Sequence, residues 1–175
     1  VVFQPFGARA FFKMPMNEIN GLQTDIHNLE DKNLIYLQES LYEADTNHQC
    51  AFLIEQFLLN KIGNPDLYNQ KRILAAIKLI NAGQYDMHVL AGASCLSPRQ
   101  FNRVFTMCVG AKPKEFQRII RFQRVLYTLQ SQININPAQL AAECGYYDQP
   151  HLIKEFKSFS GYTPTEYISE CTPFS

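Results

Sequence analysis

The C-terminal half of this 175-residue chain contains an internal repeat. Five positions recur 51 residues later with the same residue or, in the last pair, with another aromatic one: Phe105 and Phe156, Gly110 and Gly161, Pro113 and Pro164, Glu115 and Glu166, Phe116 and Tyr167. The pair Leu90–Ala91 returns as Leu140–Ala141 after 50 residues, so the second copy has one extra residue in its turn. Such a repeat predicts one supersecondary unit that occurs twice.

Each copy has the pattern of two short helices joined by a tight turn and followed by a Gly-x-x-Pro stop. The predicted helix caps and first helical positions are Asp86, Ser97 with Pro98, Asn136 with Pro137, and Asp148. Two short helices with a tight turn are typical of the helix-turn-helix, whose second helix fits the major groove of DNA. Between the copies we expect one helix from Pro113 to about Ser131, which would be about 28 Å long at 1.5 Å per residue.

The N-terminal third of the chain has a different sequence pattern from the repeat. Residues 1–13 are aromatic and β-prone with Pro5 and Gly7 in the middle, which predicts a strand, a turn and a strand. The further segments 16–29, 31–44 and 45–62 have helical spacing, with Asp31 and Asp45 as expected caps, and Asp66 is expected to cap the helix after them. The breaker cluster Gly63-Asn64-Pro65 marks the expected domain boundary.

We therefore expect a mainly α fold. It comprises a short β-hairpin and a helical segment, then two helix-turn-helix subdomains, at about 86–109 and 136–160, joined by a long linker helix at about 113–131. Residues 1–64 and 65–175 would be the two domains. The chain opens without methionine, which indicates a fragment.

Charge is distributed unevenly along the chain, although the formal net charge is zero. Residues 1–65 carry 4 basic and 8 acidic side chains, and the remainder carries 12 and 8. The stretch from Arg99 to Arg124 contains seven basic side chains and a single acidic one, Glu115. This asymmetry indicates an anionic ligand for the second half.

Several function classes have no support in the sequence. The five cysteines are at least 13 positions apart, which excludes a Cys-x-x-Cys metal or redox pair and favours a reducing cytoplasm. No apolar run is long enough for a membrane span, and no signal segment precedes the first helix. We find no catalytic set, phosphate loop, metal-ligand or cofactor motif, so we expect no enzyme, no metal and no cofactor.

On the second helix of the first copy, Arg99, Asn102 and Arg103 lie at i, i+3 and i+4, the spacing of one polar face. Arginine and asparagine are the usual bidentate readers of guanine and adenine. The corresponding outer face of the second copy offers fewer strong readers, because it carries Gln149, His151 and Lys154. The second copy should therefore discriminate less between bases.

At these residues the chain resembles the DNA-binding domain of AraC/XylS-type transcriptional regulators, over roughly residues 86–169. The pattern is carried by Leu90–Ala91, Ser97–Pro98–Arg99–Gln100–Phe101, Arg103, Phe105, Gly110, Pro113, Arg121, Leu140–Ala141, Gly145–Tyr146–Tyr147–Asp148, Phe156–Lys157 and Gly161–Tyr162–Thr163–Pro164–Thr165–Glu166–Tyr167. Two positions depart from it: Cys95 stands where the family usually has Gly in the first turn, and Ile153 is apolar where polar readers are common.

The resemblance implies a sequence-specific regulator. Residues 1–64 would be the end of an N-terminal sensing or dimerisation domain whose effector is unknown. The base-contacting positions map to Arg99, Asn102, Arg103, Gln149, His151 and Lys154. The expected phosphate contacts are Ser97, Gln100, Lys112, Lys114, Arg118 and Lys157. We expect Arg121 to form an intramolecular ion pair instead.

The expected partners are double-stranded promoter DNA, RNA polymerase and a second copy bound through the N-terminal part, with no membrane. Two alternatives stay open at this point. The chain could be a helical protein–protein interaction module, or a DNA-repair regulator with a methyl-accepting cysteine. An unchanged mass after exposure to methylated DNA would remove the last.

Overall fold

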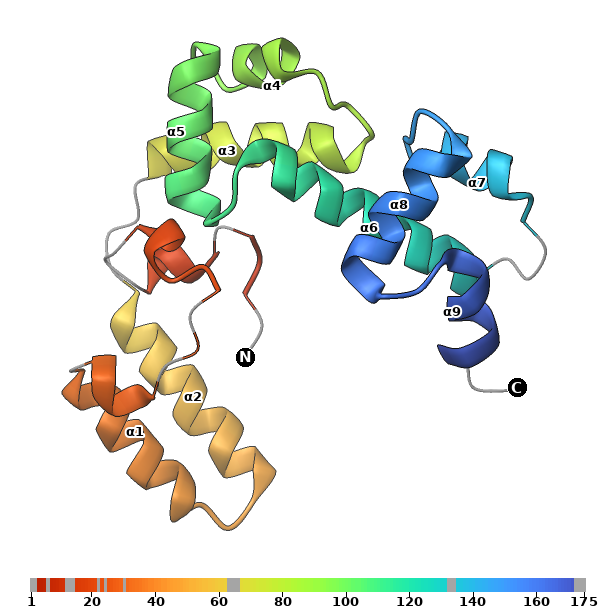
Figure 1. Cartoon of the computed structure of the whole chain (residues 1–175). Helices are drawn as coiled ribbons and strands as arrows, with labels where there is room; N and C mark the ends of the chain where they lie inside the picture. The colour runs from red at the N-terminus through yellow and green to blue at the C-terminus, as the bar shows by residue number, and fades with distance from the viewer. Residues whose placement is uncertain are drawn as a thin grey trace. The chain divides into compact units, whose positions relative to one another are not determined.

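The computed structural model shows a chain built from helices (Figure 1). It describes residues 3–5, 7–11, 15–21, 23, 25–29, 31–62, 67–131 and 135–171. Within these ranges every regular element is an α-helix or a 3-10 helix, and no strand occurs. The prediction of a mainly α fold is confirmed.

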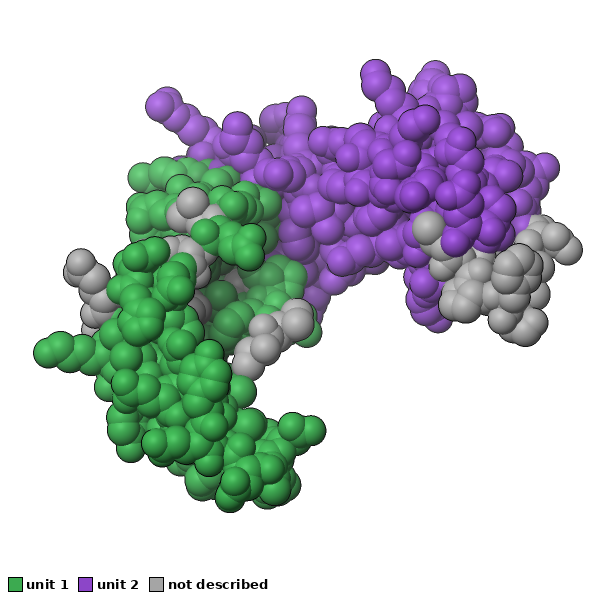
Figure 2. Space-filling model, turned by 60° about the horizontal axis from the view of Figure 1, so that its bottom comes forward, with its two compact units in different colours: residues 1–73, 103–111 green, residues 74–102, 112–175 purple. Residues whose placement is uncertain are grey.

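The chain divides into two compact units, which are coloured separately in Figure 2. Unit 1 comprises residues 1–73 and 103–111, and unit 2 comprises residues 74–102 and 112–175. Two helices, α3 (Leu67–Asn81) and α5 (Pro98–Val109), contribute residues to both units. The predicted boundary at residues 63–65 lies outside the described residues and stays a prediction.

The described part of unit 1 begins with the 3-10 helices η1 (Gly7–Ala10), η2 (Met16–Glu18) and η3 (Ile26–Leu29). The predicted β-hairpin over residues 1–13 is therefore wrong wherever the structure describes this segment. The amide of Gly7 donates to the carbonyl of Gln4 at 2.7 Å, and the amide of Phe11 donates to that of Ala8 at 3.0 Å. Local turns thus use the backbone groups that a two-stranded ladder, marginal on its own, would have paired.

Two α-helices lie side by side in unit 1, α1 (Lys32–Tyr42) and α2 (Asn47–Lys61). As predicted, Asp31 caps α1, since its carboxylate accepts from the amide of Asn33 at 3.1 Å. The second predicted cap is wrong by one residue, because Thr46 rather than Asp45 caps α2. The Thr46 hydroxyl accepts from the Gln49 amide, and the Gln49 side chain accepts from the Thr46 amide, which forms a reciprocal capping box.

Both copies of the repeat form a helix-turn-helix. The remaining helices are α4 (Met87–Ala93), α6 (Pro113–Ser131), α7 (Pro137–Glu143), α8 (Gln149–Ser160) and α9 (Pro164–Cys171). Helices α4 and α5 make the first motif, α7 and α8 make the second, and α6 connects them (Figure 1). The predicted bounds of the linker helix are thus confirmed.

The helix caps predicted for the two motifs are confirmed as well. Their side chains accept hydrogen bonds from backbone amides two or three residues further on: Asp86 from His88 and Val89, Ser97 from Gln100, Asn136 from Ala138, and Asp148 from His151. The cap predicted at Asp66 lies outside the described residues.

A hydrophobic core joins the second motif to α6. Its buried members are Val125, Leu129, Leu140, Ala141, Cys144, Tyr146, Leu152 and Phe156. Ile153 is partly buried against this core, so its side chain is not freely presented outward. Phe159 continues the helical period of the buried Leu152 and Phe156 but is 39% exposed, and its ring stacks on that of Phe122 at 5.1 Å between centroids.

The turns of the two motifs use the left-handed backbone region. Gly145 in the second turn has φ +79°, which glycine adopts without steric penalty. Cys95 in the first turn has φ +51° and is the one non-glycine residue with positive φ among those the structure describes. The cost of a side chain in the left-handed region therefore falls on the first turn, where Cys95 replaces the usual glycine.

Candidate DNA-binding surface

The outer face of α5 is polar, as its helical period requires. Arg99, Asn102 and Arg103 are exposed, whereas Phe101 and Phe105 are fully buried. The structure therefore brings the three side chains predicted to contact bases onto one exposed helical face. Their contact with bases stays a prediction.

Ser97 and Gln100 have a local structural role at the start of α5. The Gln100 side-chain oxygen accepts from the Ser97 amide at 3.2 Å and from the Ser97 hydroxyl at 3.0 Å. Both residues are exposed and lie at the helix N-terminus, where backbone amides favour an anion. The predicted phosphate contacts are compatible with this place, although the two side chains are already engaged with each other.

Helix α8 presents Gln149, His151 and Lys154, all exposed, as the sequence predicted for the second motif. His151 is more constrained than a simple surface histidine. Its ring meets the Tyr146 ring edge-on at 5.3 Å, and its Nε2 lies 3.9 Å from a carboxylate oxygen of Glu155. Histidine at this position is therefore held against the core of the motif on one side.

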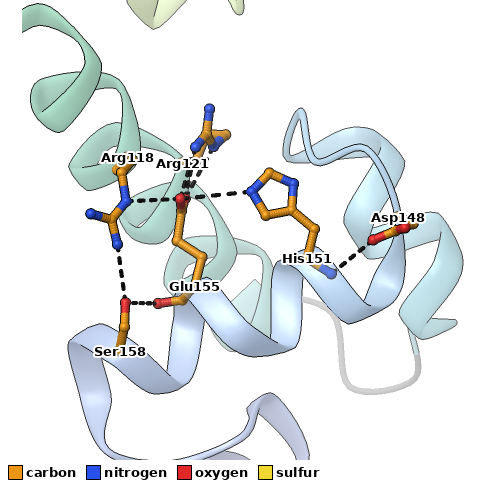
Figure 3. Close-up of polar contacts among 6 residues, drawn as sticks. All are labelled: Arg118, Arg121, Asp148, His151, Glu155 and Ser158. Carbon is orange, nitrogen blue, oxygen red and sulfur yellow. Dashed lines mark hydrogen bonds and ion pairs between the residues drawn. The ribbon is translucent and has the colours of Figure 1, made fainter.

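A buried carboxylate connects α8 to α6. Figure 3 shows Glu155 between Arg118, Arg121 and His151. Arg121 donates to both Glu155 oxygens, at 2.9 to 3.1 Å, and Arg118 donates through Nε at 2.9 Å. Arg118 also donates to the Ser158 hydroxyl at 3.2 Å. Glu155 is 6% exposed, so the two guanidinium groups compensate the charge that folding buries.

The cations of α6 consequently have different roles. The predicted intramolecular ion pair of Arg121 is confirmed, and its side chain is 12% exposed. Arg118, predicted to contact phosphate, belongs to the same cluster but is 45% exposed, so its outer edge is still open to a second anion. Arg124 donates to the backbone carbonyl of Asn81 at 2.8 Å, which ties α6 to the end of α3.

Three further cations predicted to contact phosphate are exposed: Lys112, Lys114 and Lys157. Lys112 and Lys114 flank Pro113 at the start of α6, and Lys157 lies in the last turn of α8. Exposed lysines at helix ends are suited to phosphate contacts that add affinity without reading sequence.

Sequence reasoning missed two residues that shape this surface. No role was predicted for Glu155, although it is the one acidic residue of α8 and precedes the buried Phe156. A lone acid next to a core position, opposite an arginine-rich helix, is a signal that could have revealed it. Gln117 is buried on α6 and donates to the carbonyl of Tyr85 at 3.1 Å, a contact that no sequence pattern indicated.

Among the described residues, no group of three or more His, Cys, Asp or Glu side chains could hold a metal ion. No helix in that part of the chain has both the length and the apolar character needed to cross a bilayer. Burial raises the pKa of the Cys144 thiol, which makes this cysteine less reactive.

Comparison with known proteins places these motifs in a family. The model of a helix-turn-helix domain matches residues 90–170. An uncharacterized HTH-type transcriptional regulator of Haemophilus influenzae is 30% identical over 165 residues, which are 85% of this chain and 54% of that protein. The chain thus spans about half the length of this curated relative. Neither match is described as an enzyme.

Two crystal structures have a similar fold. The DNA-binding domain of AdpA, a global transcriptional factor solved with a target DNA, is 22% identical with a TM-score of 0.51, and the match covers 58% of this chain and 89% of that domain. A regulator with an AraC-type DNA-binding domain from Chromobacterium violaceum is 22% identical with a TM-score of 0.54, over 63% of this chain and all of that one.

The family match begins inside α4 and covers the rest of the first motif, the α6 linker and the whole second motif, so it includes the helices that present the polar faces described above. The region that resembles AraC-type regulators in sequence thus matches the model of a helix-turn-helix domain at residues 90–170, and the chain is similar to an HTH-type transcriptional regulator.

Proposed function

We propose that the chain acts in the cytoplasm as a sequence-specific DNA-binding transcriptional regulator that reads two successive major-groove segments. The observation that carries this proposal is the pair of capped helices, α5 and α8, with exposed polar faces in two repeated motifs. The AdpA domain, similar in fold, was crystallised with a target DNA. The mechanism is binding, with no chemistry on the DNA.

The length of α6 supports this geometry. Its 19 residues span about 28 Å at 1.5 Å per residue. One turn of B-DNA is roughly 34 Å, so two helices at the ends of such a spacer suit neighbouring major-groove segments on one side of the duplex. A protein that binds in this way needs no symmetric dimer to reach two groove segments.

The contacts fall into two groups. Arg99, Asn102 and Arg103 on α5 would read base edges, with Arg paired to guanine and Asn to adenine. The readers on α8 would be Gln149, His151 and Lys154. Phosphate contacts from the helix ends and from the exposed edge of Arg118 would fix the register. RNA polymerase is the expected partner of the bound regulator.

Selection of duplexes from a random pool, followed by titration of the selected and random sequences, tests the proposal. We expect log affinity to fall steeply with log salt, because bound cations displace counterions. Arg103→Ala should lose about 1 to 3 kcal/mol on the selected duplex and relax one base pair. Lys114→Ala is the matched control, since a phosphate contact weakens all sequences alike. Equal losses for Arg103→Ala on selected and random DNA would contradict its reader role.

A second function is favoured by the surface of α1 and α2. No described residue of these two helices is buried, and Tyr36 and Tyr42 are 72% and 82% exposed. Leu59 and Ile62 are also half exposed, beside an apolar groove of α2. Exposed apolar side chains beside an apolar groove are typical of an interaction site. We propose that the pair of helices α1 and α2 mediates homodimerisation.

Light scattering with and without DNA tests the dimer. Leu59→Glu should convert it to monomer, whereas Glu143→Gln, an exposed residue of α7 outside this surface, should leave the mass unchanged. A monomer at all concentrations would contradict dimerisation through this surface.

A further inference from the structure

A tyrosine at the entrance of the first motif lies against the turn of the second. Tyr85 immediately precedes Asp86, the cap of α4. A Cβ atom built on Gly145 would stand 2.7 Å from Cε2 of the Tyr85 ring and 3.5 Å from its Cζ and hydroxyl. No real Cβ contact is that short, so the ring occupies the space that a side chain at residue 145 would need.

A side chain of helix α6 holds Tyr85 in place by a hydrogen bond to the Tyr85 backbone. The side-chain amide of Gln117 donates to the carbonyl of Tyr85 at 3.1 Å, and Gln117 is 5% exposed. A buried hydrogen bond of this kind is expensive to break, because the loss leaves an unsatisfied polar group. The entrance of the first motif is thus anchored to the linker helix by a second, independent contact.

The guanidinium group of Arg121 extends the contact to α8. It lies 5.4 Å from the centre of the Tyr85 ring and 5.1 Å from that of Tyr146, and it forms the bidentate pair with Glu155. Cation–π contacts at these distances are attractive. Tyr85, Arg121, Tyr146 and Glu155 therefore form one cluster, which we call the clasp, and it joins the start of α4, the middle of α6 and helix α8.

The contribution of Tyr85 comes from its ring. Its hydroxyl oxygen is buried and has no hydrogen-bond partner among the described residues. Removal of an unsatisfied buried hydroxyl is neutral or favourable, whereas removal of the ring opens the contact with Gly145 and Arg121. Phenylalanine at residue 85 should therefore preserve the clasp, and alanine should abolish it.

The two motifs differ at the corresponding turn in a way that fits this role. The first turn carries Cys95, with a Cβ at φ +51°. The second turn carries Gly145, where the Tyr85 ring excludes a Cβ atom. A glycine at residue 145 is thus required both by its backbone conformation and by the approach of a side chain from the other motif.

We infer that Tyr85 is a positioning residue that fixes the two reading helices relative to each other and thereby sets the length of DNA accepted between their two half-sites. This inference rests on the proposed function. One added base pair shifts a half-site by about 3.4 Å along the duplex and by about 34° around it. A rigid pair of helices rejects that displacement, whereas a loosely joined pair follows it.

The test uses the whole chain and a series of duplexes derived from the selected sequence. Each duplex has the two half-sites unchanged and the spacer shortened by one, unaltered, or lengthened by one or two base pairs. Affinities are measured by fluorescence anisotropy. The unaltered chain should prefer the selected spacer by about tenfold or more, which corresponds to the loss of one good base contact.

Tyr85→Ala should reduce this preference to less than about threefold, mainly by binding the altered spacers relatively better, while affinity for random DNA stays the same. Tyr85→Phe is the matched control and should keep the full preference. Circular dichroism confirms that each variant is folded. Should Tyr85→Ala fail to fold, Tyr85→Leu keeps an apolar side chain without the flat ring and takes its place.

The outcomes distinguish a failure of the proposed function from a failure of the inference about Tyr85. If the unaltered chain binds selected and random duplexes equally, the proposed function is wrong and the inference is overturned with it. If the unaltered chain prefers one spacer and the folded Tyr85→Ala variant keeps that preference, the inference alone is overturned. Loss of the preference in Tyr85→Phe to the same degree as in Tyr85→Ala would also overturn it.

Discussion

Replacement of Glu155 by alanine probes the buried charge cluster most severely. Glu155 is 6% exposed and Arg121 is 12% exposed, so the variant leaves a guanidinium group buried without its counter-charge. Arg121 loses three hydrogen bonds of 2.9 to 3.1 Å at the same time. Removal of one partner of a buried ion pair costs about 3 to 5 kcal/mol.

The expected shift in melting temperature follows from the size of the domain. At roughly 4 to 8 °C per kcal/mol for a domain of about 100 residues, Glu155→Ala should lower it by at least about 12 °C. Arg118→Ala should cost no more than about 1 kcal/mol, because Arg118 is 45% exposed and solvent screens its pair. The two variants remove opposite partners of the Arg118–Glu155 pair. Their losses of stability differ because Glu155 is buried whereas Arg118 is 45% exposed.

Thermal unfolding followed by circular dichroism measures both effects, with Glu143→Ala on the exposed face of α7 as the control, expected within about 0.5 kcal/mol of the unaltered chain. Replacement of Arg121 and Glu155 together by methionine should recover most of the loss, since no buried charge is left uncompensated and Arg118, which also loses its partner, is 45% exposed. An effect of Glu155→Ala no larger than that of Arg118→Ala would refute the reasoning.

Further predictions concern the turns, a cap and the thiols. Cys95→Gly should raise stability by up to about 1 kcal/mol by relieving a left-handed residue, and Gly145→Ala should lower it by at least about 1 kcal/mol, both read by urea unfolding; equal shifts in one direction would contradict this. Hydrogen bonds donated by the backbone amides of Val89 and His88 lower the pKa of Asp86. The contribution of this carboxylate to stability is therefore present at neutral pH and is lost as the pH falls below 3.8, the ordinary pKa of the group. Asp86→Asn should keep the cap and remove that acid dependence, which unfolding at a series of pH values measures. Iodoacetamide should label exposed Cys95 in the native chain and buried Cys144 only on unfolding, as mass spectrometry of peptides would show; rapid native labelling of Cys144 would contradict its burial.

Local signals explain how much of the fold was predictable. Proline at the first position fixes the start of a helix within a few residues, so Pro98, Pro113 and Pro137 mark α5, α6 and α7 as predicted, and a capping side chain precedes the first and the last of them. The 51-residue offset then requires the second motif to resemble the first. These signals need no knowledge of tertiary contacts.

The errors arose where local signals are weak or compete. Residues 1–13 have β propensity, but propensity without a partner strand is a poor guide, and the described part forms local turns. Asp45 and Thr46 are adjacent and both suitable caps, and the reciprocal bond with Gln49 selects Thr46. Phe159 follows the helical period of the core but lies at the end of α8, where the core no longer covers it.

The candidate site was predictable only in its outer layer. A helical period is enough to place Arg99, Asn102 and Arg103 on one exposed face. The clasp depends on contacts between residues far apart in the sequence, such as Arg121 and Glu155, which are 34 positions apart. Contacts of that kind require the packed structure, since no local pattern encodes which helix meets which.

Hydroxyl-radical footprinting of the whole chain on its selected duplex tests whether both motifs bind the same DNA at once. We expect two protected segments about 10 base pairs apart on one side of the double helix, with Arg103→Ala weakening protection of the first and Lys154→Ala that of the second. Protection of a single segment, or of two segments on opposite sides of the duplex, would contradict the proposal that both motifs read DNA together.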